Sequence, residues 1–213
     1  MTATTTIANR PAPRTLLSFA GAPTAPTALE EGCLVLIDMQ EEYVSGALPL
    51  VGIAAAIAEA GRLLAAARAV GAPIFHVVHH GRAGGALFDP DTPRVRIVEE
   101  LAPLEGETIV VKSLPNAFTR TGLADLVAAT GRRELVIAGC MTHLCVSATA
   151  RAALDLGLRS TIVADACATR DLPDPAGGIV DAATVHRAGL AALADRFAIV
   201  VGDTASLDRA RAA

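Results

Sequence analysis

Six short runs of apolar, mostly branched residues recur along the chain and are separated by segments that resemble helices. The apolar runs cover residues 33–38, 73–80, 106–113, 133–140, 158–167 and 198–202. The segments predicted to be helical cover 51–71, 94–104, 121–131, 142–157 and 182–197. Strands that alternate with helices form parallel sheets. The pattern therefore predicts an α/β protein: one three-layer α/β/α, Rossmann-like domain with a six-stranded parallel sheet and helices on both faces.

The two ends of the chain differ from this pattern. Residues 1–30 hold several prolines, two arginines and the short apolar patch LLSFAGA, and we expect an extended N-terminal arm there. The alternative is a poor signal peptide, since the patch is at the lower limit of the usual apolar core. We assign residues 31–205 to the folded domain and residues 206–213 to a C-terminal tail.

Composition narrows the class of protein. Of the 213 residues, 52% are apolar, yet no stretch approaches the roughly 18 uninterrupted apolar residues of a membrane helix. The net charge of -4, the absence of a basic stripe and the 3% of aromatic residues argue against nucleic-acid binding. Four cysteines without CxxC spacing in a domain of this size favour a reducing, cytoplasmic location over a disulfide framework. We expect neither a nucleic acid nor a membrane as a partner.

Polar residues gather at the predicted carboxyl ends of the strands, where open parallel sheets bind their ligands. Asp38 follows the first strand, and the adjacent His79 and His80 end the second. Lys112 lies near the end of the third strand, and the segment 140–145 follows the fourth. Asp165, near the end of the fifth strand, is expected to anchor the loop after it. No glycine-rich phosphate loop accompanies these residues, so a nucleotide is not expected.

Cys145 is the best candidate for a nucleophile in this set. Thr142 can serve as an N-cap, which would put Cys145 in the first helical turn. Free N–H groups and the helix dipole favour an anion there, so we expect a thiol with a lowered pKa. Cys140 ends an apolar strand and is expected to be a buried wall of the turn. Taken alone, Asp38 could simply cap a loop and Lys112 could extend to water.

Three segments resemble the isochorismatase-like cysteine hydrolase superfamily, which also contains nicotinamidases and N-carbamoyl and cyclic amide hydrolases. They read LVLIDMQEEY, VVKSLPNAFTRTGLADLV and ELVIAGCMTHLCVSATARAALDLGLRSTIVADACATRD, and the likeness extends over about residues 30–203. It implies a catalytic triad of Asp38, Lys112 and Cys145. It also implies a cis peptide bond between Cys140 and Met141, with the backbone amides of Met141 and Cys145 forming an oxyanion hole.

The resemblance also indicates which chemistry to expect. Because Cys145 is present, we expect hydrolysis of a C–N bond in an amide, carbamoyl compound or cyclic amide through a thioester. The alternatives are a vinyl-ether hydrolase of the isochorismatase type, which would use Asp38 and Lys112 only, and a non-catalytic member of the fold. Nicotinamidases bind a metal through Asp and His residues after the second strand. Here the DxH pattern is missing and His79 and His80 point to opposite faces of a strand, so no metal and no cofactor is expected.

The remaining expectations concern the substrate pocket and the assembly. Four residues in loops that should roof the pocket are expected to contact a small-molecule substrate: Tyr43, Phe88, Asn116 and Phe118. Thr142 is added to them because it precedes the nucleophile. We expect His76 and His143 to be structural, with backbone partners. Alanine-rich helices suggest a homo-oligomer, and members of the family that the chain resembles are commonly dimers or tetramers.

Overall fold

The computed structural model describes residues 12–209, and its centre is one parallel sheet. The strands are β1 (Cys33–Ile37), β2 (Ile74–His79), β3 (Thr108–Lys112), β4 (Glu134–Cys140), β5 (Arg159–Ala168) and β8 (Ile199–Val201). They lie in the order β3-β2-β1-β4-β5-β8, and every neighbouring pair is parallel. The predicted six-stranded parallel sheet is therefore confirmed.

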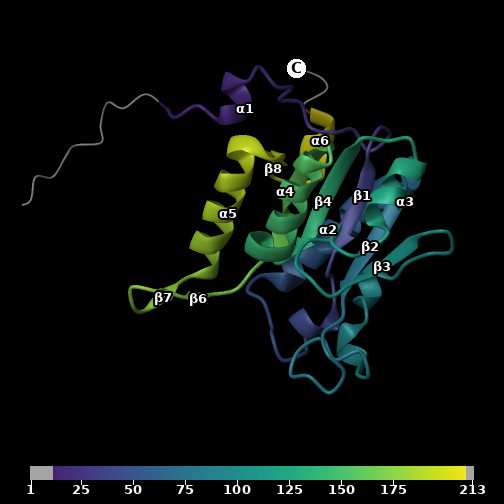
Figure 1. Ribbon diagram of the computed structural model, residues 1–213, viewed down its shortest axis with the longest axis vertical. Coiled ribbons are helices and arrows are strands. Elements are labelled where there is room, and N and C mark those ends of the chain that lie inside the picture. Colours follow the sequence, from purple (N-terminus) through teal and green to yellow (C-terminus); the bar gives the residue numbers. More distant parts are fainter. Residues whose placement is uncertain (1–11, 210–213) are drawn as a thin grey trace, which may run out of the picture.

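Helices cover both faces of the sheet and complete the three layers (Figure 1). One core joins α2 (Ile53–Ala69) to the side chains of β1, β4 and β5 that point to its face. The other core joins the opposite face to α3 (Leu123–Ala129), α4 (Ser147–Asp155) and α5 (Ala182–Arg196). Since β1 and β4 are apolar on both faces, they are buried in the middle of the sheet.

Residues at the helix ends explain two of these boundaries. α2 starts after Gly52, whose φ of 74° suits glycine, and a second left-handed glycine, Gly71, follows its end. α5 starts after Asp181, whose carboxylate accepts a hydrogen bond from the N–H of Thr184 at 2.8 Å. Both helices begin at the carboxyl edge of the sheet, which is the edge where the polar residues were predicted to gather.

Three segments differ from the predictions. The helix predicted over 94–104 is wrong, because the chain forms two 3-10 turns there, η2 (Pro93–Val95) and η3 (Glu99–Leu101). A hairpin of β6 (Leu172–Pro173) and β7 (Ile179–Val180) was not predicted, and it extends away from the body of the molecule (Figure 1). The third difference is η1 (Glu41–Tyr43), a 3-10 turn after β1 that was not predicted.

The segments outside the predicted domain are partly helical. Within the arm predicted to be extended, α1 (Leu16–Phe19) forms one helical turn, and the N–H of Leu16 donates to the carboxylate of Asp195 on α5 at 2.9 Å. At the other end, α6 (Ala205–Arg209) covers the start of the predicted tail, and Leu207 is buried in the core with α2. Residues 1–11 and 210–213 lie outside the described part. None of the helices within residues 12–209 has the length and apolar character needed to cross a membrane.

Candidate active site

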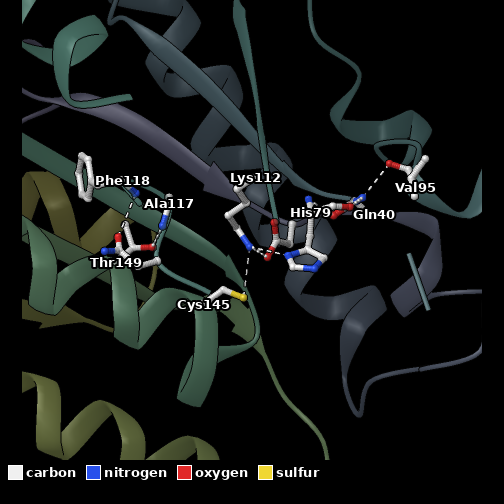
Figure 2. A network of polar contacts seen from close by, with 10 residues as sticks. Gln40, His79, Val95, Lys112, Ala117, Phe118, Cys145 and Thr149 are labelled. Carbon is white, nitrogen blue, oxygen red and sulfur yellow. Dashed lines mark hydrogen bonds and ion pairs between the residues drawn. The ribbon is translucent and has the colours of Figure 1, made fainter. Parts of the chain in front are cut away.

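Lys112 lies at the centre of a buried polar cluster at the carboxyl edge of the sheet. Its Nζ donates to Oδ2 of Asp38 at 2.7 Å and to Sγ of Cys145 at 3.4 Å. It also lies 3.2 Å from Nδ1 of His79 (Figure 2). Asp38 and the Lys112 side chain are fully buried, and Cys145 is 4% exposed. The structure therefore brings together the three residues predicted to form a triad, which come from the position after β1, the end of β3 and the segment after β4.

Burial dominates the electrostatics of this cluster. It raises the pKa of Asp38 to about 6, although the nearby Lys112 ammonium lowers it in part. The nearby Cys145 thiol also lowers the pKa of Asp38. No hydrogen bond of ordinary geometry reaches Oδ1, which has no partner among the described residues. Asp38 also has a φ of 52°, a left-handed conformation that is uncommon for residues other than glycine. The carboxylate thus keeps one buried oxygen available.

The predicted lowering of the Cys145 pKa is wrong. Burial, together with the negative charge of Asp38, raises the pKa of Cys145 to about 12, and Lys112 offsets only part of this. Cys145 does lie close to a helix start, in η4 (Thr142–Val146), which leads directly into α4. Burial is the largest effect on the pKa there, so the thiol keeps its proton until a base removes it.

A close approach between two backbones shapes the turn that carries Cys145. Gly139 has a φ of 132°, and a Cβ atom at this position would lie 2.0 Å from the carbonyl oxygen of Ile37. The pairing of β4 with β5 shifts in register between Ile137 and Gly139. The next peptide bond, Cys140–Met141, is cis, as the resemblance implied. Cys140 is fully buried, and burial raises its pKa well above the ordinary value.

Thr142 does not cap the helix as predicted. Met141 occupies the N-cap position without a side-chain hydrogen bond, because the backbone enters η4 one residue earlier. The Thr142 hydroxyl instead donates to the carbonyl of Ala168 at 3.2 Å and lies 2.9 Å from Nδ1 of His186 on α5. These contacts attach the start of the turn to the end of β5, on the side away from Lys112. A contact of Thr142 with substrate stays a prediction.

His76 and His143 were expected to have backbone partners, but each of them bonds a side chain instead. His76 lies 2.8 Å from the Glu107 carboxylate, and His143 lies 2.6 Å from the Thr169 hydroxyl. Asp165, expected to anchor a loop, is exposed on β5, and its N–H donates to the carbonyl of Gly202.

Phe88 and Tyr43, the two predicted roof residues, lie beside the cluster through His79, and their contact with a substrate stays a prediction. Their rings pack edge to face with centroids 5.2 Å apart, and the Phe88 ring packs in the same way on His79 at 5.0 Å. The fully buried Glu42 holds this roof, since its two carboxylate oxygens accept hydrogen bonds from the N–H groups of Phe88 and Ala47, at 3.0 and 2.6 Å. One side chain thus joins the segment that carries Ala47 to the loop that carries Phe88.

Asn116 and Phe118 belong to a separate loop that packs on α4. The Asn116 side chain bonds locally, accepting from the N–H of Phe118 and donating to Thr119. The N–H of Ala117 donates to the hydroxyl of Thr149 on α4 at 3.0 Å (Figure 2). Contacts of Asn116 and Phe118 with a substrate stay predictions. In the structure the polar groups of these two residues stabilise the loop.

Sequence reasoning did not assign roles to three residues of the site: His79, Gln40 and Glu42. Gln40 is 1% exposed, and its side chain bonds both backbone groups of His79. Both Gln40 and Glu42 directly follow the apolar run that ends at Asp38, and their position next to it was the available signal. Within residues 12–209, no group of three or more His, Cys, Asp or Glu residues could hold a metal ion.

Comparison with known proteins gives a consistent result. The isochorismatase domain model matches residues 32–205. A secreted isochorismatase effector of Verticillium dahliae is 38% identical over 184 residues, which is 86% of this chain and 94% of the relative. An isochorismatase from Pseudomonas putida KT2440, known from its crystal structure, has a TM-score of 0.88 and 44% identity, covering 92% of this chain and all of that one.

Relatives named for other activities are also similar to the chain. A streptothricin hydrolase of Streptomyces noursei is 38% identical and covers 78% of this chain and 61% of its own length. A maleamate amidohydrolase of Pseudomonas putida is 31% identical over 153 residues, 64% of this chain and 72% of its own. Since the domain model matches most of the chain and the relatives are hydrolases, the protein belongs to the isochorismatase family of hydrolases.

Proposed function

We propose that the protein hydrolyses a C–N bond of a small amide, carbamoyl compound or cyclic amide through a thioester on Cys145. The observation that carries this proposal is the position of the Lys112 ammonium, which bonds both the Asp38 carboxylate and the Cys145 sulfur inside a buried cluster. A nucleophile, a base and a cation that touch one another out of water are the components of nucleophilic acyl transfer. The similarity to a maleamate amidohydrolase adds support for C–N chemistry.

In the resting state of the proposed reaction, the proton is on the Cys145 thiol and not on Asp38. Because the pKa of Cys145 is raised to about 12 and that of Asp38 only to about 6, the cluster at neutral pH holds a carboxylate and a neutral thiol. Asp38 then accepts the thiol proton as the sulfur attacks the carbonyl carbon, and Lys112 balances the negative charge during the transfer. A base with a pKa near 6 is suited to this exchange at neutral pH.

The bond changes follow from these positions. The sulfur–carbon bond forms and gives a tetrahedral oxyanion, for which the N–H groups of Met141 and Cys145 are the proposed donors. The C–N bond breaks as Asp38 returns the proton to the leaving nitrogen, which leaves a thioester. Asp38 next takes a proton from water, the hydroxide adds to the thioester carbonyl, and the thiol departs with a proton to restore the resting state.

The experiment that tests this proposal is a panel of primary, carbamoyl and cyclic amides, assayed with wild type and Cys145→Ala side by side. Ammonia release reports the first two classes, and mass analysis reports ring opening, which frees no ammonia. We expect at least one amide to be turned over by wild type and none by the alanine variant. Substantial amide hydrolysis by Cys145→Ala would contradict the proposal.

One observation favours a second candidate, a vinyl-ether hydrolase of the isochorismatase type. Asp38 has a raised pKa and a buried oxygen that finds no partner within residues 12–209, which is what a general acid that protonates a vinyl ether needs. Cys145 would then not react. Isochorismate belongs in the same panel for this reason, and equal consumption by wild type and Cys145→Ala would select this candidate over the thioester route.

A further inference from the structure

The Lys112 ammonium has three acceptors for its three protons. Asp38 Oδ2 lies at 2.7 Å, His79 Nδ1 at 3.2 Å and Cys145 Sγ at 3.4 Å, and each comes from a different element. The Lys112 side chain is fully buried. An ammonium group donates and never accepts, so the contact with His79 requires a lone pair on Nδ1. The direction of each of these hydrogen bonds is therefore fixed.

This contact determines the chemical state of His79. If Nδ1 accepts from Lys112, the imidazole is neutral and carries its proton on Nε2. The surroundings favour the same state: burial, the Lys112 charge and the neighbouring His80 lower the pKa of His79 to about 4. Lys112 and His80 are the charged or titratable groups that lower the pKa of the ring, and the nearby Asp38 carboxylate bonds the same ammonium. His79 is thus an uncharged acceptor throughout the neutral range.

His79 is held in place from two sides. The side chain of Gln40 accepts from the N–H of His79 at 2.8 Å and donates to its carbonyl at 3.0 Å. The same amide donates to the carbonyl of Val95 at 2.8 Å, which ties the end of β2 to η2 (Figure 2). The Phe88 ring packs against the imidazole. A residue fixed in both backbone and ring can set the position of a flexible lysine side chain.

We propose that His79 is a positioning residue, which accepts a hydrogen bond from Lys112 through Nδ1 and thereby keeps Nζ between Asp38 and Cys145. This inference rests on the proposed role of the triad. Without the third acceptor, Nζ is expected to move toward the charged carboxylate, which is the stronger acceptor. The contact with sulfur is the longest of the three and is the one that would be lost.

The test uses three substitutions that separate the two ring nitrogens. In His79→Asn the side-chain oxygen can take the place of Nδ1, in His79→Gln a polar atom can take the place of Nε2, and His79→Leu has neither. The measurement is the rate of alkylation of Cys145 by iodoacetamide between pH 6 and pH 10. Each rate is read from fragment ions that distinguish Cys145 from Cys140 within the peptide they share, because Cys33, Cys140 and Cys167 are also free thiols. His80→Asn is the matched control.

We expect His79→Asn and His80→Asn to keep rates close to wild type. His79→Gln and His79→Leu should react roughly tenfold more slowly at a given pH, as expected for one hydrogen bond lost from a charged group. Their profiles should move upward by about one pH unit, because a thiolate without its cation needs a higher pH. Turnover should follow the same order.

Three results would overturn the proposal: rates that all equal wild type, equal losses in all three variants, or rescue by Gln but not by Asn. The last would make Nε2 the functional atom. If His79→Leu does not fold, the comparison between Asn and Gln still decides the matter, since both are polar. Alkylation needs no turnover, so amide hydrolysis by Cys145→Ala would overturn the proposed function without changing this outcome.

Discussion

The two ends of β3 carry two carboxylate clusters that differ in one respect. At the start of the strand, both oxygens of Glu107 are occupied: Arg68 donates to each of them, at 2.7 and 3.0 Å. His76 lies 2.8 Å from the second oxygen, and the N–H of Leu104 donates to it at 3.0 Å. At the far end, Oδ2 of Asp38 accepts a hydrogen bond from Lys112, and Oδ1 has no partner among the described residues.

This difference shifts the pKa values of the two carboxyl groups in opposite directions. For Glu107, burial alone would raise the pKa, but the hydrogen bonds from Arg68, Leu104 and His76 together lower it to about 2. For Asp38, burial outweighs the effects of Lys112 and the Cys145 thiol and raises the pKa to about 6. A fully bonded carboxylate stabilises the fold and stays ionised. A carboxylate with one open oxygen is destabilised as an anion and can exchange a proton near neutral pH.

The largest expected effect separates the two clusters by activity. Asp38→Asn should lower kcat/KM by about 10²–10⁴-fold, because the amide cannot take the thiol proton. Glu107→Gln should leave kcat/KM within about twofold, since no atom of that cluster touches the triad. Steady-state kinetics of the two variants on one amide measures both. An active Asp38→Asn enzyme would contradict the role given to the open oxygen.

The second effect separates them by stability. Glu107→Gln should lower the free energy of unfolding by about 2 kcal/mol, the scale for losing hydrogen bonds to a charged group. Because the pKa of Glu107 is lowered from 4.5 to about 2, its contribution is complete above pH 4.5 and is lost as the pH falls toward 2. Urea unfolding at pH 7 and pH 3 measures both statements. Glu105→Gln, at an exposed position two residues away, is the control.

The third effect is the pH dependence of the reaction. The base must be ionised, and the pKa of Asp38 is raised to about 6, so kcat/KM should fall about tenfold per unit as the pH drops below 6. A profile measured from pH 4.5 to pH 8 shows this limb. Glu107→Gln should leave the limb in place. A midpoint near 4, the ordinary value for an aspartate, would contradict the raised pKa.

The smallest effect tests one contact of the saturated cluster. Burial lowers the pKa of His76, so the neutral ring donates to Glu107 through Nε2 at 2.8 Å. His76→Leu should lower the free energy of unfolding by about 1 kcal/mol, the usual net value of one hydrogen bond. His76→Gln can present an amide donor in place of Nε2 and should recover part of the loss. Equal losses in the two variants would assign the effect to packing instead.

The sheet could be predicted because its signals are local. β1 and β4 are continuous apolar runs, and Gly71, Gly131 and Gly157 follow the ends of three helices, so the elements are visible in the sequence. The segment 94–104 was predicted wrongly because a short apolar pattern near prolines is equally compatible with two 3-10 turns. The β6–β7 hairpin has only two residues in each strand and therefore no recognisable period.

The position of the triad residues was also visible in the sequence, but their environment was not. Asp38, Lys112 and the turn after β4 each follow an apolar strand, which is sufficient to place them at one edge of the sheet. The raised pKa of Cys145 depends on burial and on the charge of Asp38, which lies 107 positions away along the chain. Likewise, Gln40 contacts His79 across 39 positions. Contacts between residues so far apart along the chain produce no periodic pattern in the sequence.

The way Glu42 bonds the loop of Phe88 has a consequence for how that loop tolerates substitution. Glu42 bonds Phe88 through the backbone N–H, not through the side chain. A different side chain at residue 88 would therefore leave that bond in place and change the packing on Tyr43 and His79. Variation at this single position can thus alter the surroundings of His79 without rebuilding the loop, which offers a simple route for natural divergence and for laboratory evolution.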